Sequence, residues 1–166
     1  LRAVQYFITK ENINDIWSAS GFRKDIGLLS IDIDGNDYWV WDAIQHMNPS
    51  VIITEYNSLF GYENAYTIPY NPGFIRGRKT PFNFYGTSLK AAYLLAKKRG
   101  YFFIGCNSAG NNAYFIREDL RKSCPVAETT LQEGFNFASF SETWQQGEPR
   151  RGKDKIISIA GQQVVN

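Results

Sequence analysis

The sequence is poor in the residues that most often bind metals or act as nucleophiles. Its 166 residues include two cysteines and one histidine. Cys106 and Cys124 lie in no metal-ligand spacing and can form at most one bridge, so we expect two reduced thiols. His46 lies near the end of an expected helix, where we assign it no catalytic role. No Ser-His-Asp order, Walker loop or zinc motif can be assembled from the sequence.

Long apolar runs and a strong excess of one charge are also absent. No apolar run approaches the ~20 residues that cross a bilayer, and the first residues, from Leu1 on, lack the features of a signal peptide. Eighteen basic and 16 acidic side chains leave a net charge of +2 at pH 7, without the concentrated basic stripe that binds phosphate backbones. We therefore expect a cytoplasmic protein that binds neither membranes nor nucleic acid.

Apolar and aromatic residues, in contrast, are abundant, at 43% and 16% of the chain. They suffice for one domain with a core over residues 1–166, and the chain is too short to expect two. Because the chain begins with Leu1 and its first apolar segment follows at once, we expect that an upstream part has been removed.

Apolar periodicity alternates between the strand and helix patterns, which predicts an α/β fold with a mainly parallel sheet. The first expected helix is capped by Thr9 and ended by Gly21. Another expected helix begins at Thr87-Ser88 and ends at Gly100. A loop of turn formers separates the last two strands of the sheet, which predicts a terminal antiparallel hairpin. The expected strands are 3–8, 27–33, 51–54, 101–106 and 113–117, and a further helix is expected over about 36–47.

Two segments lack this periodicity. Residues 57–85 are rich in Tyr, Phe, Asn, Gly and Pro, and are longer than most loops of compact domains. Their many aromatic side chains argue against disorder, so we interpret this segment as a folded lid or insertion. Residues 120–166 form a mixed, polar C-terminal extension with a basic cluster at Arg150, Arg151 and Lys153 and a strand-like stretch at 156–159.

Polar residues follow each expected strand, at the edge where open α/β sheets bind their ligands. Asp32 and Asp34 are two apart on a strand and should share a face, while Glu55 ends the neighbouring strand ~5 Å away. A carboxylate at the end of an apolar run is costly unless it is paired or functional. We therefore expect Asp32, Asp34 and Glu55 to be catalytic, and expect the substrate to be bound by Tyr56, Asn57, Asn107 and Ser108.

Three carboxylates in one crevice repel each other unless a proton or a cation lies between them. Hard divalent cations take oxygen ligands, so Mg²⁺ or Mn²⁺ held by Asp32, Glu55 and Asn57 is one possibility. For Asn36 and Asp37, capping of the strand-to-helix turn is at least as well supported as catalysis.

Four segments resemble the second half of FkbM-like class I methyltransferases: LLSIDIDGNDYWVW, VIITEYN, GTSLKAAYLLAKKRGY and FIGCNSAGNNAYFIR. The resemblance spans roughly residues 8–119. It implies a Rossmann-like, three-layer fold with sheet order 3-2-1-4-5-7-6 and an antiparallel strand 7. Residues 3–8 would be strand 3, 27–33 strand 4 and 51–54 strand 5, the hairpin would supply strands 6 and 7, and strands 1 and 2 would be lacking.

The resemblance also implies S-adenosylmethionine as the cofactor. That family holds the cofactor mainly through a glycine-rich loop after strand 1, and no G-x-G run precedes a helix in this sequence. Most of the cofactor would therefore be bound by the missing N-terminal part, with Asp32 and Gly35 as contacts here, and the fragment alone would be inactive. A weaker similarity to catechol-type O-methyltransferases places Asp32, Glu55 and Asn57 where those enzymes hold Mg²⁺, although their lysine base has no match.

Three functions remain open from the sequence. The resemblance implies methyl transfer to an oxygen or nitrogen of a small-molecule or glycan acceptor. Asp32-Ile33-Asp34 after an apolar strand is also a D-x-D pattern, which indicates a metal-dependent glycosyltransferase as an alternative. The third is a degenerate Rossmann-like module without catalysis that binds a partner through its aromatic loop.

Overall fold

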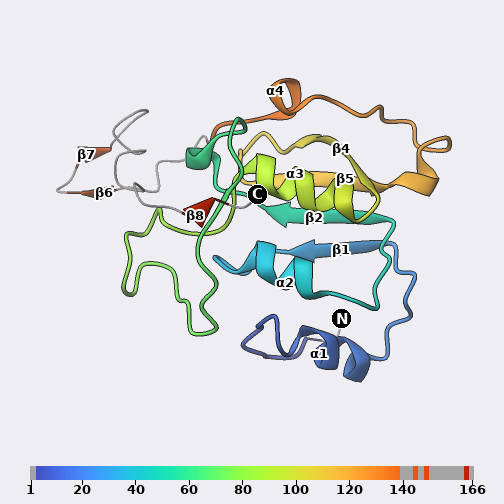
Figure 1. Ribbon diagram of the computed structural model, residues 1–166, viewed down its shortest axis with the longest axis horizontal. Helices are drawn as coiled ribbons and strands as arrows, with labels where there is room; N and C mark the ends of the chain where they lie inside the picture. The colour runs from blue at the N-terminus through green and yellow to red at the C-terminus, as the bar shows by residue number, and fades with distance from the viewer. Residues whose placement is uncertain (1–2, 139–143, 146–147, 150–162, 165–166) are drawn as a thin grey trace.

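The sheet is built from two short apolar strands and a hairpin (Figure 1). In this computed structural model, residues 3–138 are described, together with the backbone of 144–145, 148–149 and 163–164. The strand expected at 156–159 and the basic cluster expected around Arg150 lie outside the described residues. The main strands are β1 (Leu28–Ile31), β2 (Val51–Glu55), β4 (Tyr101–Cys106) and β5 (Asn112–Arg117).

The sheet has the order β1-β2-β5-β4. β1 pairs with β2 in parallel, from Leu28 opposite Val51 to Ile31 opposite Thr54, as predicted. β5 is antiparallel to both β2 and β4, which confirms the terminal hairpin. The described part is thus an α/β structure with a mixed sheet. The predicted mainly parallel pairing is not found among these strands, because β5 pairs antiparallel with both of its neighbours. The carboxyl ends of β1 and β2 meet at one edge.

The first helix begins after Asn12 and not after Thr9 as predicted, whereas two other helix ends follow the predicted capping residues. The helix α1 (Ile13–Ser20) ends at Gly21, which has a φ of 75°, and the Ser88 side chain accepts the N–H of Ala91 at the start of α3 (Leu89–Lys98). The helix α2 (Asp37–Ala43) is shorter than the predicted 36–47. It stops because Ile44 is extended and the Arg99 guanidinium binds the last carbonyl oxygens of the helix, so no further turn is needed to satisfy them.

The strand predicted at residues 3–8 does not form. Val4 and Phe7 are 60% and 57% exposed, so their side chains do not pack as those of a sheet strand would. An apolar segment becomes a strand only where a neighbour can pair with its backbone, and the described residues provide none here. The prediction was wrong because an apolar run alone does not specify a partner.

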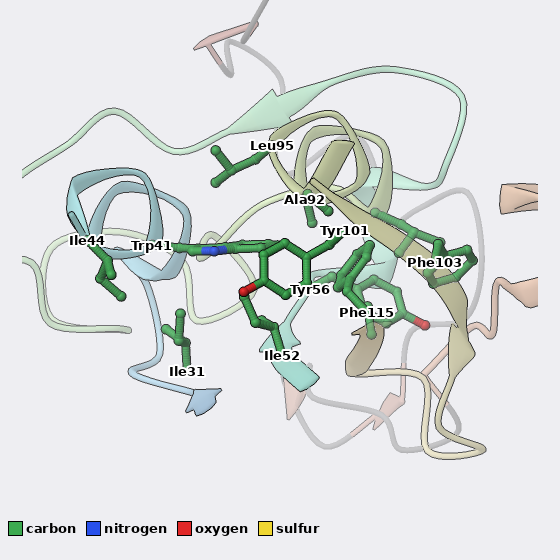
Figure 2. Close-up of a cluster of buried hydrophobic side chains, with 13 residues drawn as sticks. Ile31, Trp41, Ile44, Ile52, Tyr56, Ala92, Leu95, Tyr101, Phe103 and Phe115 are labelled. Carbon is green, nitrogen blue, oxygen red and sulfur yellow. The ribbon is translucent and has the colours of Figure 1, made fainter. Parts of the chain in front are cut away.

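The larger hydrophobic core joins α2 and α3 to one face of the sheet (Figure 2). Trp41 of α2 lies against Phe115 of the central strand β5, with ring centroids 5.6 Å apart, and Phe115 lies 5.4 Å from Phe103 of β4. Ile52 of β2 and Leu95 of α3 complete this layer. Burial of such large side chains supplies most of the free energy that orders the sheet.

Residues 57–85 are folded and lie beyond the carboxyl ends of β1 and β2, as Figure 1 shows in green. The segment contains the 3₁₀ helix η1 (Ser58–Phe60) and the short strand β3 (Tyr66–Thr67), which pairs with β8 (Gln163–Val164). Ile68 and Phe60 form a second, smaller core within it. The remaining elements are η2 (Glu118–Leu120), α4 (Leu131–Gly134), β6 (Trp144–Gln145) and β7 (Glu148–Pro149).

Two further findings bear on the cysteines and on membranes. Both Cys106 and Cys124 are free thiols, as predicted. In the part of the chain that the structure describes, no helix has the length and apolar character needed to span a bilayer.

The position of Phe115 gives a prediction about stability. Phe115 is fully buried between Trp41 and Phe103, so Phe115→Ala should lower the free energy of unfolding by about 3–5 kcal/mol, from lost burial plus the cavity left behind. Urea denaturation followed by circular dichroism measures this. The matched control is Phe7→Ala at an exposed phenylalanine, which should stay within about 0.5 kcal/mol of the parent chain. Equal losses in the two variants would contradict this description of the core.

Candidate site at the carboxyl edge of the sheet

The turn between β1 and α2 is held by a buried carboxylate. The two Asp37 oxygens accept the N–H groups of Ile33 and Gly35, each at 2.9 Å. Asp34 between them has a φ of 57°, a left-handed backbone that Asp tolerates better than most residues. Burial raises the pKa of Asp37 to about 6, while these backbone N–H groups lower it. Asp37 therefore stabilises the turn through hydrogen bonds to its backbone. This role is similar to the capping role that the sequence supported for Asp37.

The two catalytic candidates Asp32 and Asp34 lie in this turn. β1 ends at Ile31, so they do not share a strand face as predicted. Both are exposed, and Asp34 forms an ion pair with Arg76, with 2.7 Å between its Oδ1 and the arginine Nη1. Partial burial, followed by the charge of Asp34, raises the pKa of Asp32. Asp32 thus remains accessible at the edge with an enhanced affinity for a proton.

Glu55 lies beside Asp32, one position beyond the last paired residues of the parallel β1–β2 ladder. It is 5% exposed, and its Oε2 has no hydrogen-bond partner among the described residues. Burial and then the charges of Asp37, Asp32 and Asp34 raise its pKa to about 9. Glu55 is therefore neutral at pH 7 and carries a proton in the midst of other carboxylates. The expected meeting of Asp32, Asp34 and Glu55 at one edge is found.

Two residues that the sequence analysis missed complete this edge. Asn112 of β5 is the register partner of Glu55, and its Oδ1 also lacks a hydrogen-bond partner among the described residues. The Arg76 guanidinium lies over the rings of Tyr85 and Phe82, 3.5 and 4.4 Å from their centroids. Its charge lowers the pKa of Glu55 and Asp32. No local sequence pattern marks either residue, because both come to the edge through tertiary packing.

The aromatic segment covers this turn closely. A Cβ atom at Gly35 would lie 2.3 Å from the Phe74 ring, so only glycine fits beneath that side chain. The Asn36 amide donates to the carbonyl of Asn71 at 2.8 Å. Because the Gly35 N–H is bound to Asp37 and covered by Phe74, the predicted cofactor contact at Gly35 is not accessible in this conformation.

Tyr56 and Asn57, expected to bind substrate, hold the fold together instead. The Tyr56 side chain is fully buried, and its hydroxyl donates to the carbonyl of Asn136. The Asn57 amide donates to the carbonyls of Asn83 and Tyr85 at 2.9 and 3.0 Å, while its Oδ1 accepts an N–H of the following helix turn. These bonds fasten both ends of the aromatic segment to the end of β2.

Asn107 has a similar structural role in the β4–β5 loop. Its Oδ1 accepts the N–H groups of Gly110, Asn111 and Asn112, each at 3.1 Å. Ser108 is exposed at the tip of the same loop. Asn107 therefore sets the loop geometry that brings Asn112 next to Glu55. Of the two predicted substrate-binding residues Asn107 and Ser108, Ser108 is the one that faces solvent.

Asp32, Glu55 and Asn57, predicted to hold Mg²⁺ or Mn²⁺, include one side chain that makes other contacts in the described structure. No group of three or more His, Cys, Asp or Glu side chains in the described ranges is arranged to hold a metal ion. Asn57, the expected neutral ligand, directs its side chain to backbone groups. The unpartnered oxygens of Glu55 and Asn112 suit hydrogen-bond donors.

The raised pKa of Glu55 predicts that the protein loses stability as the pH rises. The folded protein keeps a proton on Glu55 up to about pH 9, whereas the unfolded chain releases it near 4.5, so higher pH favours unfolding between these values. The slope should be at most about 1.4 kcal/mol per pH unit. Asp37, whose pKa is also raised by burial, adds a further loss of stability as the pH rises from 3.8 to about 6.

Urea denaturation at several pH values between 6 and 9 measures this slope. Glu55→Gln keeps the neutral shape and should remove most of it. The matched control, Glu63→Gln at an exposed glutamate, should leave it unchanged. A slope that persists in Glu55→Gln would show that another group carries the pH dependence.

The carboxyl edge thus combines an accessible carboxylate, a neutral buried carboxyl group and a covering arginine. Such a set can orient a ligand that presents N–H or O–H donors and can accept a proton from it. Comparison of the chain with protein-family models, curated proteins and solved structures yields no match.

Proposed function

We propose that these residues belong to a Rossmann-like class I methyltransferase, which transfers a methyl group from S-adenosylmethionine to an oxygen or nitrogen of a small-molecule or glycan acceptor. The single observation that carries this proposal is the sheet order. β1-β2-β5-β4, with β5 reversed, corresponds to the strand order 4-5-7-6 at one end of the sheet of that class. In this assignment the site residues follow strands 4 and 5.

In that fold, further strands would extend the sheet beyond β1. The outer edge of β1 has no partner strand among the described residues, and a strand 1 would pair there. Leu28, on the sheet face opposite the core, is 53% exposed and would be covered by the second helix layer of a three-layer structure.

The residues at the carboxyl edge fit part of the cofactor. S-adenosylmethionine is a cation that presents ammonium and hydroxyl donors, and the accessible carboxylate of Asp32 suits such groups, while the unpartnered oxygens of Glu55 and Asn112 are buried. The sequence has no glycine-rich loop before a helix, so these residues would provide only a share of the contacts. When bound, the cofactor supplies an electrophilic methyl group.

The side chains of this chain would act mainly by orientation and proton transfer. Asp32 is accessible, and its raised pKa makes it a better acceptor for the proton of a hydroxyl or ammonium group. Glu55 keeps its proton and donates or accepts a hydrogen bond without adding charge. Phe74 lies over Gly35 in the turn, and Arg76 pairs with Asp34 beside it.

Asp32→Asn tests this proposal in the complete gene product that contains the sequence. We expect calorimetry to detect S-adenosylmethionine binding, and assays with labelled cofactor over a panel of sugars and amines to detect methyl transfer. Asp32→Asn should reduce kcat by about 10²- to 10⁴-fold, because a proton acceptor is removed while the shape is kept. The 166-residue chain alone should bind the cofactor weakly or not at all.

Asp15→Asn, at an exposed position of α1, is the matched control and should leave kcat unchanged. A nucleotide sugar with Mn²⁺ is titrated in parallel. Binding of the nucleotide sugar without binding of S-adenosylmethionine would move the assignment to a glycosyltransferase. Tight cofactor binding by the 166-residue chain alone would show that the cofactor site is misplaced.

A further inference from the structure

The aromatic segment 57–85 contains a tip, residues 71–82, which lies beyond the carboxyl ends of β1 and β2 and is drawn in green in Figure 1. None of the residues in the tip is buried, and Phe82 is 53% exposed. The chain on both sides of the tip is buried, since Ile68 and Tyr85 are only 0% and 3% exposed. A segment with so few buried contacts opens at a small cost in free energy while its buried surroundings stay folded.

Both ends of the tip are fixed to the rest of the domain. At one end, the Tyr70 hydroxyl donates to the Glu11 carboxylate, and the Lys10 ammonium lies 4.1 Å from the centroid of the Tyr70 ring. At the other end, the Asn83 carbonyl accepts the Asn57 amide at 2.9 Å. Two glycines lie between these points. Because glycine adopts backbone conformations that other residues rarely reach, the tip can move while its ends stay in place.

Two polar contacts hold the tip against the β1–α2 turn. The Nη1 of Arg76 lies 2.7 Å from the Oδ1 of Asp34. The Asn71 carbonyl accepts the amide of Asn36 at 2.8 Å. The Asp34 side chain is 63% exposed, so water and salt compete for its ion pair with Arg76. Because an ion pair with an exposed partner contributes little free energy, this contact can break and form again without loss of the fold.

Phe74 of the tip covers part of the turn. A Cβ atom at Gly35 would lie 2.3 Å from the Phe74 ring, so a ligand cannot contact Gly35 while the tip is in this position. The N–H groups of Gly35 and Ile33 both donate to Asp37 at 2.9 Å. Gly35 is buried, whereas Ile33 is only half-buried. The two N–H groups therefore share one acceptor, and Gly35 is the one that lies beneath Phe74.

We propose that residues 71–82 form a lid, which Phe74 and the Arg76–Asp34 ion pair hold closed over the β1–α2 turn and which moves outward as a unit to admit a ligand. A ligand with an ammonium group would pair with Asp34 in place of Arg76 and so favour the open state. In the proposed methyl transfer this ligand is S-adenosylmethionine, so the role of the lid in binding rests on that function. The movement of the lid does not depend on it.

Hydrogen exchange of the Gly35 N–H measures the opening, and exchange of the Ile33 N–H reports any loosening of the turn itself. In ¹H–¹⁵N spectra of the 166-residue chain, Arg76→Gln should accelerate Gly35 exchange by about 3- to 10-fold, because an ion pair and a contact with aromatic rings are lost. Phe74→Ala should accelerate it by at least about tenfold, since the cover itself is removed. Ile33 exchange should stay within about twofold of the parent chain in both variants.

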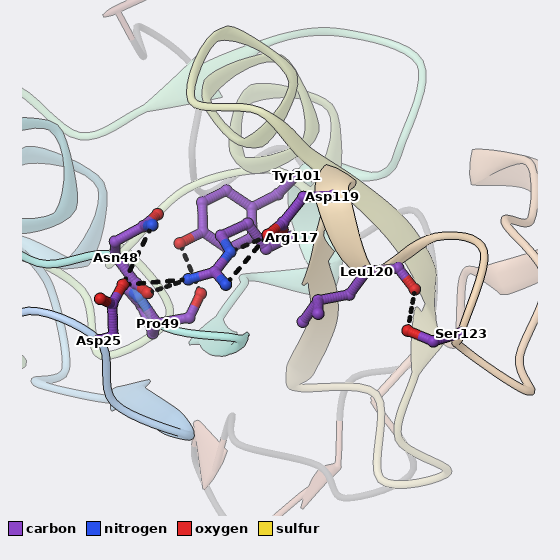
Figure 3. A network of polar contacts seen from close by, with 8 residues as sticks. All are labelled: Asp25, Asn48, Pro49, Tyr101, Arg117, Asp119, Leu120 and Ser123. Atoms are coloured by element: carbon purple, nitrogen blue, oxygen red, sulfur yellow. Dashed lines mark hydrogen bonds and ion pairs between the residues drawn. The ribbon is translucent and has the colours of Figure 1, made fainter.

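Arg117→Gln is the matched control. Arg117 forms an ion pair of the same length, 2.7 Å, with Asp119 where β2 begins (Figure 3). The side chains of Arg76 and Arg117 are similarly buried, with 10% and 18% of their surface exposed. This variant should leave Gly35 exchange within about twofold of the parent chain.

The parent chain provides a test that needs no variant. Raising NaCl from about 0.05 to about 0.5 M screens exposed ion pairs and should accelerate the exchange of Gly35 but not of Ile33. Equal acceleration of the two N–H groups, by salt or by the variants, would overturn the proposal, because the turn and not the lid would then be opening. Unchanged Gly35 exchange in Arg76→Gln and Phe74→Ala would also overturn it. No cofactor is present in these measurements, so failure of the proposed methyl transfer would leave their outcome unchanged.

Discussion

The buried carboxylate of Asp37 is the constraint on which the carboxyl edge depends. By accepting two backbone N–H groups of the β1–α2 turn, it holds Asp34 in a left-handed conformation and places Asp32 at the surface. After burial, the charge of Asp37 is also the largest influence on the pKa of Glu55. One side chain therefore sets both the shape of the turn and the protonation of its neighbour, because a charge inside a protein acts over a longer range than in water.

The aromatic segment 57–85 is organised around the same turn. Asn57 binds it at the end of β2, and Phe74 and Arg76 close over Gly35 and Asp34. Arg76 lies on aromatic rings, which lets a guanidinium remain charged while its side chain is largely buried. The abundance of aromatic residues in this long segment thus has a physical explanation. They supply the apolar surface that orders a segment with little regular secondary structure.

The two edges of the sheet carry groups of opposite charge. Carboxyl groups gather where β1 and β2 end, and the partly exposed guanidinium groups of Arg99 and Arg117 bind backbone carbonyls near the point where these strands begin. At each edge a polar group lacks a partner among the described residues: acceptor oxygens on Glu55 and Asn112, and a donor nitrogen on Arg99.

The sequence by itself determined the helices α1 and α3, the parallel pair β1–β2 and the β4–β5 hairpin, because their apolar periods and capping residues act over a few neighbouring positions. It also placed Asp32 and Glu55 together, since parallel strands joined by one helix end at the same edge. Tertiary structure alone decided that residues 3–8 form no strand, that Asn57 and Asn107 serve the fold, and that Arg76 and Asn112 join the site. The physical reason is that strand pairing, burial and charge neutralisation depend on partners far away in the chain, which no local pattern encodes.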